Sequence, residues 1–170
     1  MPCLARYTRL SGLIAAVVMS SALAYAADEE EASHVPPTLE SSPFTSEREA
    51  VTWRQNELKD LERLLRQLRF DLVNNRDARG AAPRLAELQQ HATPEYFLPA
   101  FIEGTGGRGS DARPEIWEEW DDFIAGFQDL EQKVSVLVEA AEQEDYRAAT
   151  RAFSELSLSC RSCHRAYRYK

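Results

Sequence analysis

The chain has 170 residues, a formal charge of −8, 44% hydrophobic residues and 28% charged residues. This composition is typical of one globular domain with tails, and it excludes disordered, collagen-like and repeat chains. Seven Gly and three Cys exclude a disulfide-dense scaffold. The acidic balance argues against nucleic-acid binding, which needs a basic surface for the phosphates.

Residues 1–26 have the pattern of a secretory signal peptide. Arg6 and Arg9 precede an uncharged apolar run over 10–23, and a small-x-small cleavage site ends at Ala26. The alternative is an uncleaved membrane anchor, but the run is shorter than the roughly 20 residues that span a bilayer. The sequence therefore predicts an exported protein.

The exported chain divides into a lead-in and a folded domain. Residues 27–45 are acidic and then rich in Ser and Pro, without an apolar period, and they predict a flexible segment. The folded domain is expected over 46–170. Ser46 and Glu49 form a capping box that starts the first helix, which should end near residues 74–75.

One charged residue interrupts the apolar stripe of this first helix. Arg54 stands between Val51 and Leu58, at a position that should face the core. A charge at such a position needs a buried or half-buried partner, because leaving it unpaired in a core is costly.

Three further helices complete the pattern. A short helix is expected to start at Pro83, a third at Pro114 and a fourth near Asp145. Four Gly in 104–109 indicate a surface loop; a phosphate-binding loop would need a preceding strand and a following Gly-Lys-Ser/Thr. Trp120 and Phe123 continue an apolar stripe and should be core residues. The sequence predicts an all-α, antiparallel four-helix bundle.

The last predicted helix carries the chemistry. Cys160, Cys163 and His164 form C-x-x-C-H, the attachment motif of c-type haem. Two thiols three residues apart on a helix face the same way, so both can add to haem vinyl groups as thioethers. His164 can then bind the iron as an axial ligand. We expect one covalent haem c, buried in the bundle near the C-terminal helix.

Three other uses of these residues remain open. The cysteines could form a disulfide in an oxidising compartment. They could act as a thiol–disulfide redox pair, although such pairs accompany a βαβ pattern that is not seen here. A zinc site would need more ligands than His34 and His91 readily supply.

The second axial position is expected to have no protein ligand. Both methionines, Met1 and Met19, lie within the predicted signal peptide. His91 ends a short helix and His34 lies in the lead-in. We therefore predict a five-coordinate, high-spin iron; a low-spin, six-coordinate electron carrier is the alternative.

Three stretches resemble the cytochrome c prime family, which comprises periplasmic four-helix-bundle haem proteins of bacteria. They are CRSCHRAYR at 160–168, GT at 104–105 with DARPEIW at 111–117, and WRQ at 53–55 with Leu58. Together they cover roughly residues 49–170. The resemblance implies a periplasmic location and places the haem on Cys160 and Cys163, with His164 as the proximal ligand.

The resemblance also implies roles for residues outside the C-x-x-C-H motif. Arg54 and Gln55 would lie near the haem propionates, and a propionate would then be the partner that Arg54 needs. Leu58 matches the apolar distal position. Arg168 would lie beside the proximal face, and Asp111 near the haem edge.

This site predicts a binding protein without substrate turnover, because no general base is placed near the iron. An apolar distal side favours the neutral gases NO and CO, and a redox protein is a further expected partner. Family members are often homodimers packed through helix one, and Trp53 and Leu64 are expected to point outward there. Basic residues near the C-terminus suit the helix dipole or an acidic redox partner: Arg161, Arg165, Arg168 and Lys170.

Overall fold

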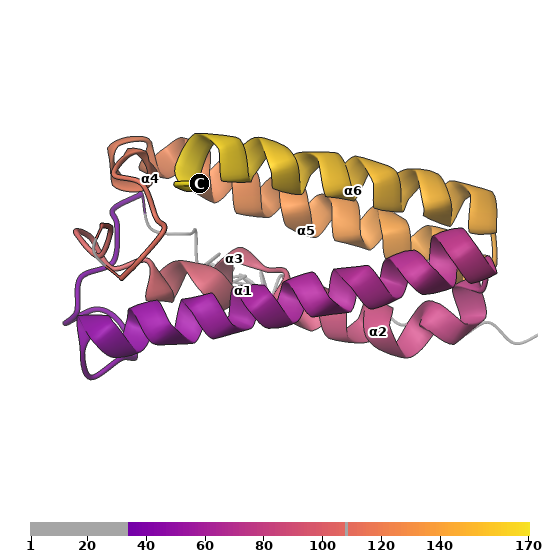
Figure 1. Cartoon of the computed structure of the whole chain (residues 1–170), viewed down its shortest axis with the longest axis horizontal. Helices are drawn as coiled ribbons and strands as arrows, with labels where there is room; N and C mark the ends of the chain where they lie inside the picture. Colours follow the sequence, from indigo (N-terminus) through magenta and orange to yellow (C-terminus); the bar gives the residue numbers. More distant parts are fainter. Residues whose placement is uncertain (1–33, 108) are drawn as a thin grey trace, which may run out of the picture. The chain divides into compact units, whose positions relative to one another are not determined.

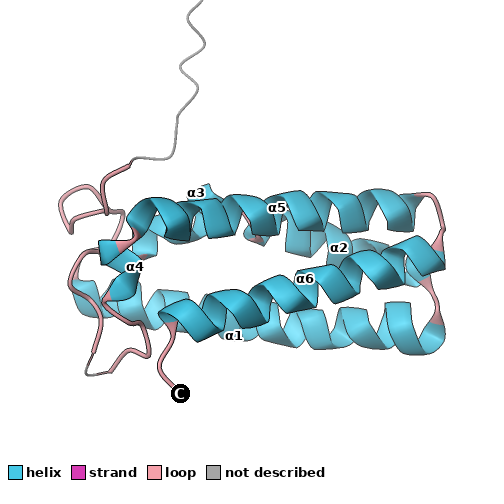
Figure 2. Cartoon of the chain, turned by 90° about the horizontal axis from the view of Figure 1, so that it is seen from above, coloured by secondary structure: helices cyan, strands magenta, loops and turns pink. Residues whose placement is uncertain are grey.

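The computed structural model describes residues 34–107 and 109–170. These residues form helices and loops, with one isolated β-bridge and no strand among them. Four of the helices are 14 to 23 residues long and form an antiparallel bundle (Figures 1 and 2), which confirms the predicted fold. In chain order the elements are α1 (Glu47–Arg69), a π-helix (Phe70–Asn75), α2 (Ala78–His91), α3 (Pro94–Phe97), a 3-10 turn (Leu98–Ala100), α4 (Glu115–Glu118), α5 (Trp120–Glu142) and α6 (Tyr146–Tyr167).

Local capping bonds explain where the long helices begin. The Ser46 hydroxyl accepts a hydrogen bond from the Glu49 backbone N–H at 3.2 Å, as expected. The Glu49 carboxylate reaches the Thr45 N–H at 2.8 Å, one residue before the position that a standard capping box uses. At α6 the Asp145 carboxylate accepts from two backbone N–H groups, both at 3.0 Å. The predicted starts of the first and the fourth helix are confirmed.

The predicted start of the second helix at Pro83 is wrong. Helix α2 starts at Ala78, where the Asp77 carboxylate accepts from the Gly80 N–H at 2.8 Å. Pro83 lies inside the helix, where it cannot donate to the carbonyl of Arg79. Pro83 is exposed, so its ring is accommodated on the solvent side. The N-cap at Asp77 was the stronger signal.

The core has two parts that differ in composition. The aliphatic cluster lies where α1 and α2 meet the turn between α5 and α6, and the aromatic cluster lies at the opposite end of α5. The predicted core residues Trp120 and Phe123 are buried in the aromatic cluster. The largest members of the aliphatic cluster are Leu64, Leu68, Leu72, Leu85, Leu88, Val134, Leu137, Phe153 and Leu156; those of the aromatic cluster are Phe97, Phe101, Ile116, Trp120, Phe123, Ile124 and Phe127.

The described part of the lead-in lies on the bundle, in contrast to the flexible segment expected. The Pro37 carbonyl accepts from the Glu103 N–H at 2.9 Å. The Phe44 ring lies 5.5 Å from the Trp53 ring, centroid to centroid. A segment without apolar periodicity can thus be held by one aromatic anchor. The predicted signal peptide lies outside the described residues, and no helix among those described is long and apolar enough to span a membrane.

The outward apolar face expected on α1 is not found. Leu64 is only 4% exposed and belongs to the aliphatic cluster, so this prediction is wrong. Trp53 is half-buried, with its ring 5.2 Å from that of Tyr96. Leu64 follows Leu61 by three residues, so the two side chains lie on the same inner face of α1. The apolar stripe read from Val51 through Leu58 did not include this position.

Candidate haem-attachment site

The two cysteines lie on α6, one turn apart and on one side of the helix. Both thiols are free and half-buried, with no disulfide between them. Along α6 they lie between Leu156, its last residue in the aliphatic cluster, and Tyr167, which contacts the aromatic cluster. Two thiols are therefore held on one face of a regular helix, as attachment to the two vinyl groups of a single porphyrin requires.

Burial changes the acidity of both thiols. It raises the pKa of Cys160, and it raises the pKa of Cys163 to about 11, with the neighbouring Cys160 adding to the effect. Both thiols are therefore protonated at neutral pH. A thiol–disulfide enzyme needs the opposite, a lowered thiol pKa that supplies thiolate. The described structure thus disfavours the redox-pair interpretation.

The His164 imidazole makes no hydrogen bond to any described residue, although its backbone carbonyl accepts from Arg168. Burial lowers the imidazole pKa, Arg168 lowers it further, and Glu62 on α1 partly offsets this. A neutral imidazole without a hydrogen-bond partner is free to bind a metal. Two free thiols followed by such an imidazole fit the donor set that haem c requires.

A zinc site has no comparable support. Among residues 34–107 and 109–170, no group of three or more His, Cys, Asp or Glu is arranged to hold a metal ion. The ring of His91 stacks on Tyr96 with centroids 4.7 Å apart, and the imidazole of His34 lies 2.8 Å from the Asp121 carboxylate. Neither histidine joins the cysteines.

Arg54 has the buried partners that its position in the helix predicts. The residue is 2% exposed, and its guanidinium lies 4.9 Å from the Phe101 ring centroid. One terminal nitrogen donates to the Ala100 carbonyl at 2.9 Å and to Thr105 Oγ1 at 2.7 Å. The other donates to the Thr105 carbonyl at 2.7 Å and to Ser110 Oγ at 2.9 Å.

These bonds show what sequence reasoning missed at Arg54. Its partners are neutral groups of one loop, and the four terminal N–H groups are all used, so only Nε–H remains for another acceptor among the described residues. Burial lowers the pKa of Arg54 to about 10, which leaves it charged at neutral pH. The interrupted stripe signalled that a partner exists, but not which segment supplies it.

Residues 100–107 and 109–113 lead from the end of the 3-10 turn to α4 and contact both α1 and the end of α6; we call them the 100–113 loop. On the α1 side, Gln55 Nε2 donates to the Gly109 carbonyl at 2.9 Å. At Gly106 a Cβ would lie 2.9 Å from both the Ala112 carbonyl oxygen and the Trp117 ring, so a side chain would clash there. The glycines serve the path of this loop, in agreement with the surface-loop prediction.

On the α6 side, the same loop pairs with the residues that follow the haem motif. The Arg113 N–H donates to the Tyr167 carbonyl at 3.0 Å, and the Tyr169 N–H donates to the Asp111 carbonyl at 2.8 Å. The Arg168 guanidinium lies 3.1 Å from the Asp111 carboxylate. The structure therefore brings Arg54, Gln55, Asp111 and Arg168 together around one loop, at the end of the bundle where α6 terminates (Figure 1).

Leu58 lies one turn after Arg54 and is half-buried against the aromatic cluster. Tyr167, one turn after His164, packs on the same cluster, with its ring 5.2 Å from that of Phe123. The predicted distal residue and the helical turn that carries the predicted axial ligand thus border one aromatic region.

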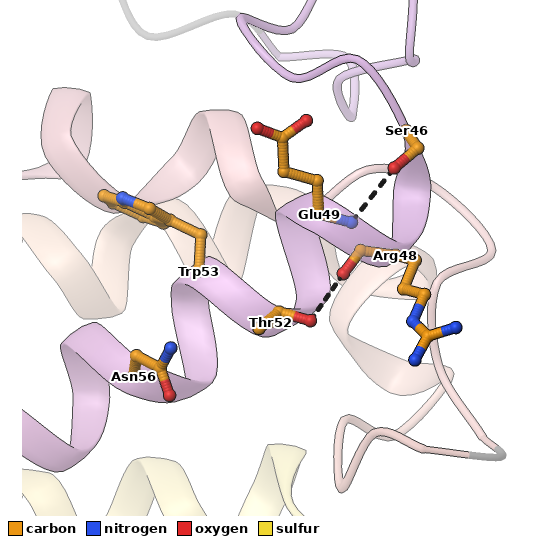
Figure 3. Close-up of a pocket in the computed structure, with 6 residues that line it drawn as sticks. All are labelled: Ser46, Arg48, Glu49, Thr52, Trp53 and Asn56. Carbon is orange, nitrogen blue, oxygen red and sulfur yellow. Dashed lines mark hydrogen bonds between the residues drawn. The ribbon is translucent and has the colours of Figure 1, made fainter.

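A surface depression on the outer side of α1 carries none of this chemistry (Figure 3). Its hydrogen bonds are local helix contacts, such as that from the Thr52 hydroxyl to the Arg48 carbonyl at 2.8 Å. It contains no thiol or imidazole. The lining residues are Ser46, Arg48, Glu49, Thr52, Trp53 and Asn56.

A four-helix bundle with C-x-x-C-H on its last helix defines the class of bundle-type c-type cytochromes. The family model of cytochrome C' matches residues 49–168, and the chain belongs to this family of haem proteins. Cytochrome c' of Alcaligenes xylosoxydans xylosoxydans is 41% identical over 76 residues, which cover 43% of this chain and 58% of that protein. The matched stretch is thus less than two thirds of that relative.

Solved structures are similar over a longer stretch. A nitrosyl complex of a cytochrome c prime variant from Alcaligenes xylosoxidans has a TM-score of 0.67 and 29% identity, covering 75% of this chain and 99% of that one. A variant with bound carbon monoxide, from the same organism, has a TM-score of 0.66 with the same identity and coverage. These likenesses confirm the resemblance drawn from the sequence motifs.

Proposed function

We propose that this chain is a periplasmic haem c protein that binds NO and CO and exchanges electrons. One haem would be held by thioether bonds to Cys160 and Cys163, with His164 as axial ligand. The observation that carries the proposal is the pair of free, half-buried thiols on one face of α6, followed directly by an imidazole without a hydrogen-bond partner. When bound, the haem supplies an iron that takes up diatomic gases and changes oxidation state by one electron.

The second axial position would stay open to ligands from outside the chain. No methionine exists beyond Met19, and His34 and His91 both contact other side chains. Leu58, the residue that the family resemblance places on the distal side, offers no hydrogen bond. An apolar distal surface favours neutral gases, because anions lose solvation there without a compensating donor. Variants of a relative have been solved with NO and with CO bound.

Arg54 and Gln55 would serve the haem from the propionate side, as the family resemblance implies. Four N–H groups of Arg54 already hold the 100–113 loop, so a propionate would use Nε–H or compete with the loop. Asp111 and Arg168 would border the haem edge from the same loop. No general base is placed beside His164, so we propose a binding and redox role and no catalysed reaction.

Absorption spectra test the proposal. The full chain is produced in a host that matures haem c, and its ferric, ferrous and CO-treated ferrous forms are compared. We expect high-spin spectra and a clear change on adding CO. Low-spin spectra indifferent to CO would replace the proposal with a six-coordinate electron carrier. Absence of any haem band would return the case to thiol chemistry at Cys160 and Cys163.

Two assembly features complete the proposal. We propose cleavage near Ala26 and export, which the intact mass of the purified protein would test. We also propose a homodimer, which rests on the family resemblance alone because Leu64 is buried. Light scattering on the haem-loaded protein would give its mass; a monomer at all concentrations would contradict the dimer.

A further inference from the structure

Three residues of α6 and its C-cap residue, Arg168, form a surface beside the haem motif. Leu158, Arg161 and Arg165 recur at spacings of three and four, so they lie on one face of the helix, and Arg168 follows directly after its last residue. All four are exposed, Leu158 to 59%. We call this set the arginine face. Figure 2 shows α6 along the outside of the bundle.

Two of these arginines keep an uncompensated charge. Arg168 is paired with Asp111, but no ion pair joins Arg161 or Arg165 to an acidic side chain among the described residues. The nearby Glu119 carboxylate accepts from the Tyr167 hydroxyl at 3.3 Å, on the core-facing side of α6. A local positive surface therefore persists on a chain whose net charge is −8.

The dipole of α6 accounts for Arg165, which lies in the last turn, but not for the whole surface. The dipole stabilises cations mainly within the last turn of a helix. Helix α6 ends at Tyr167, so Arg161 lies six residues before its end. An exposed Leu158 on the same face gains nothing from the dipole. Exposed apolar area next to unpaired arginines is instead typical of a protein interface.

The arginine face lies next to the predicted iron ligand. Arg161 precedes His164 by three residues and is its neighbour on the helix surface. Arg168 caps the helix and donates its backbone N–H to the His164 carbonyl at 3.2 Å. The His164 ring lies between this face and the cysteines, because Cys160 precedes it by four residues. A molecule seated on the arginine face would thus approach the iron from the side of its axial ligand.

We propose that the arginine face docks an acidic electron-transfer protein, which exchanges one electron with the iron. The inference rests on the proposed function and adds the class of partner and its docking place. The partner loses one electron and the ferric iron gains it, without making or breaking a covalent bond. We infer an acidic partner from charge complementarity, because the arginine face is positive whereas the chain as a whole is acidic.

The sign of the ionic-strength effect tests the proposal. The ferrous haem-loaded protein is mixed with ferricyanide, an anion, or with tris(phenanthroline)cobalt(III), a cation. The net negative charge of the chain requires the ferricyanide rate to rise with added salt. The arginine face requires the reverse: the ferricyanide rate falls with salt, and the cobalt rate rises. The first pattern would overturn the proposal.

Charge reversal locates the effect. In Arg161→Glu/Arg165→Glu, the ferricyanide rate at low salt should fall about ten-fold, within the range of electrostatic steering. Arg165→Glu/Lys170→Glu leaves the Cys-x-x-Cys-His segment unchanged and should shift the rate in the same direction. The matched control, Arg147→Glu/Arg151→Glu, reverses two exposed charges at the other end of α6 and should change it little. Equal effects in the test and control variants would overturn the proposal.

Direct binding separates the classes of partner. Polyglutamate should bind the haem-loaded protein, and binding should weaken in Arg161→Glu/Arg165→Glu but not in the control. Vesicles of anionic phospholipid that bind more tightly than polyglutamate would replace the protein partner with a membrane surface. Failure of the proposed function is distinguishable, because the haem spectrum of each variant is recorded before any kinetic or binding measurement.

Discussion

The two ends of the bundle are built by different rules. At the aliphatic cluster, Leu and Val side chains interdigitate and helical periodicity alone accounts for the packing. At the aromatic cluster, a charged Arg54 is buried and a glycine loop crosses between helices, and two half-buried thiols lie between the two clusters. Chemistry-bearing residues lie where the simple pattern of apolar and polar positions fails, because a functional site accepts groups that packing alone would exclude.

The largest effect is expected from the thiols between these two ends. In Cys160→Ala/Cys163→Ala, covalent haem should be lost completely, because no thiol remains to form a thioether. Mass spectrometry of the denatured protein measures this directly as the loss of the haem mass. Ser162→Ala, between the cysteines, is the matched control and should keep the mass. Covalent haem retained in the double variant would contradict the assignment.

Arg54 and Leu137 allow the two ends to be compared in one measurement. Arg54→Ala leaves the Ala100 carbonyl, Thr105 and Ser110 without their donors, and we expect a loss of about 3 kcal/mol in the free energy of unfolding. Leu137→Ala removes a fully buried side chain from the aliphatic cluster and should cost about 3 kcal/mol as well. Denaturant unfolding of both variants gives the two values.

Limited proteolysis then separates the two causes. Arg54→Ala should expose the 100–113 loop to cleavage, whereas Leu137→Ala should leave the loop as resistant as in the parent protein. Arg63→Ala, which removes an exposed ion pair with Asp60, should change the stability by no more than about 0.5 kcal/mol. A loop protected equally in Arg54→Ala and Leu137→Ala would contradict its anchoring by Arg54.

The aliphatic end was predictable from the sequence apart from the start of α2 and the inward position of Leu64, and the aromatic end only in part. The caps at Ser46 and Asp145 act within four residues, so local signals placed both helix starts. The C-x-x-C-H motif is equally local. The partners of Arg54 lie 46 to 56 residues away along the chain, in a loop whose path depends on glycine conformations and on pairing with the C-terminus. No periodicity encodes such a contact.

Two errors have related causes. The start of the second helix at Pro83 is wrong because the Asp77 side chain satisfies backbone donors as an N-cap, whereas a proline merely tolerates the first turn. Leu64 is buried because the apolar face of α1 is wider than the single stripe through Leu58, Leu61, Leu65 and Leu68. A stripe wide enough to contact both α2 and α5 includes it.

The smallest expected effect is a pH dependence at the aromatic end. Burial and the hydrogen bond to Glu57, at 2.7 Å, raise the pKa of Tyr96 to about 12, from about 10 in an unfolded chain. The folded protein holds this proton more tightly, so the contribution to stability is present below about pH 10 and is lost as pH rises toward 12. Tyr96→Phe should therefore lose stability less steeply than the parent protein across this range.

The pH dependence of stability must be measured as a difference between two proteins, because the titration of Arg54 changes the stability in the direction opposite to that of Tyr96. Burial lowers its pKa to about 10, so between pH 10 and 12 the unfolded chain binds more protons at this residue and stability rises with pH. Both proteins contain Arg54, and subtracting their midpoints of thermal unfolding at each pH cancels its contribution. Tyr169→Phe, at an exposed tyrosine, is the control. Parallel curves for parent and Tyr96→Phe would show that the Tyr96–Glu57 bond does not couple folding to alkaline pH.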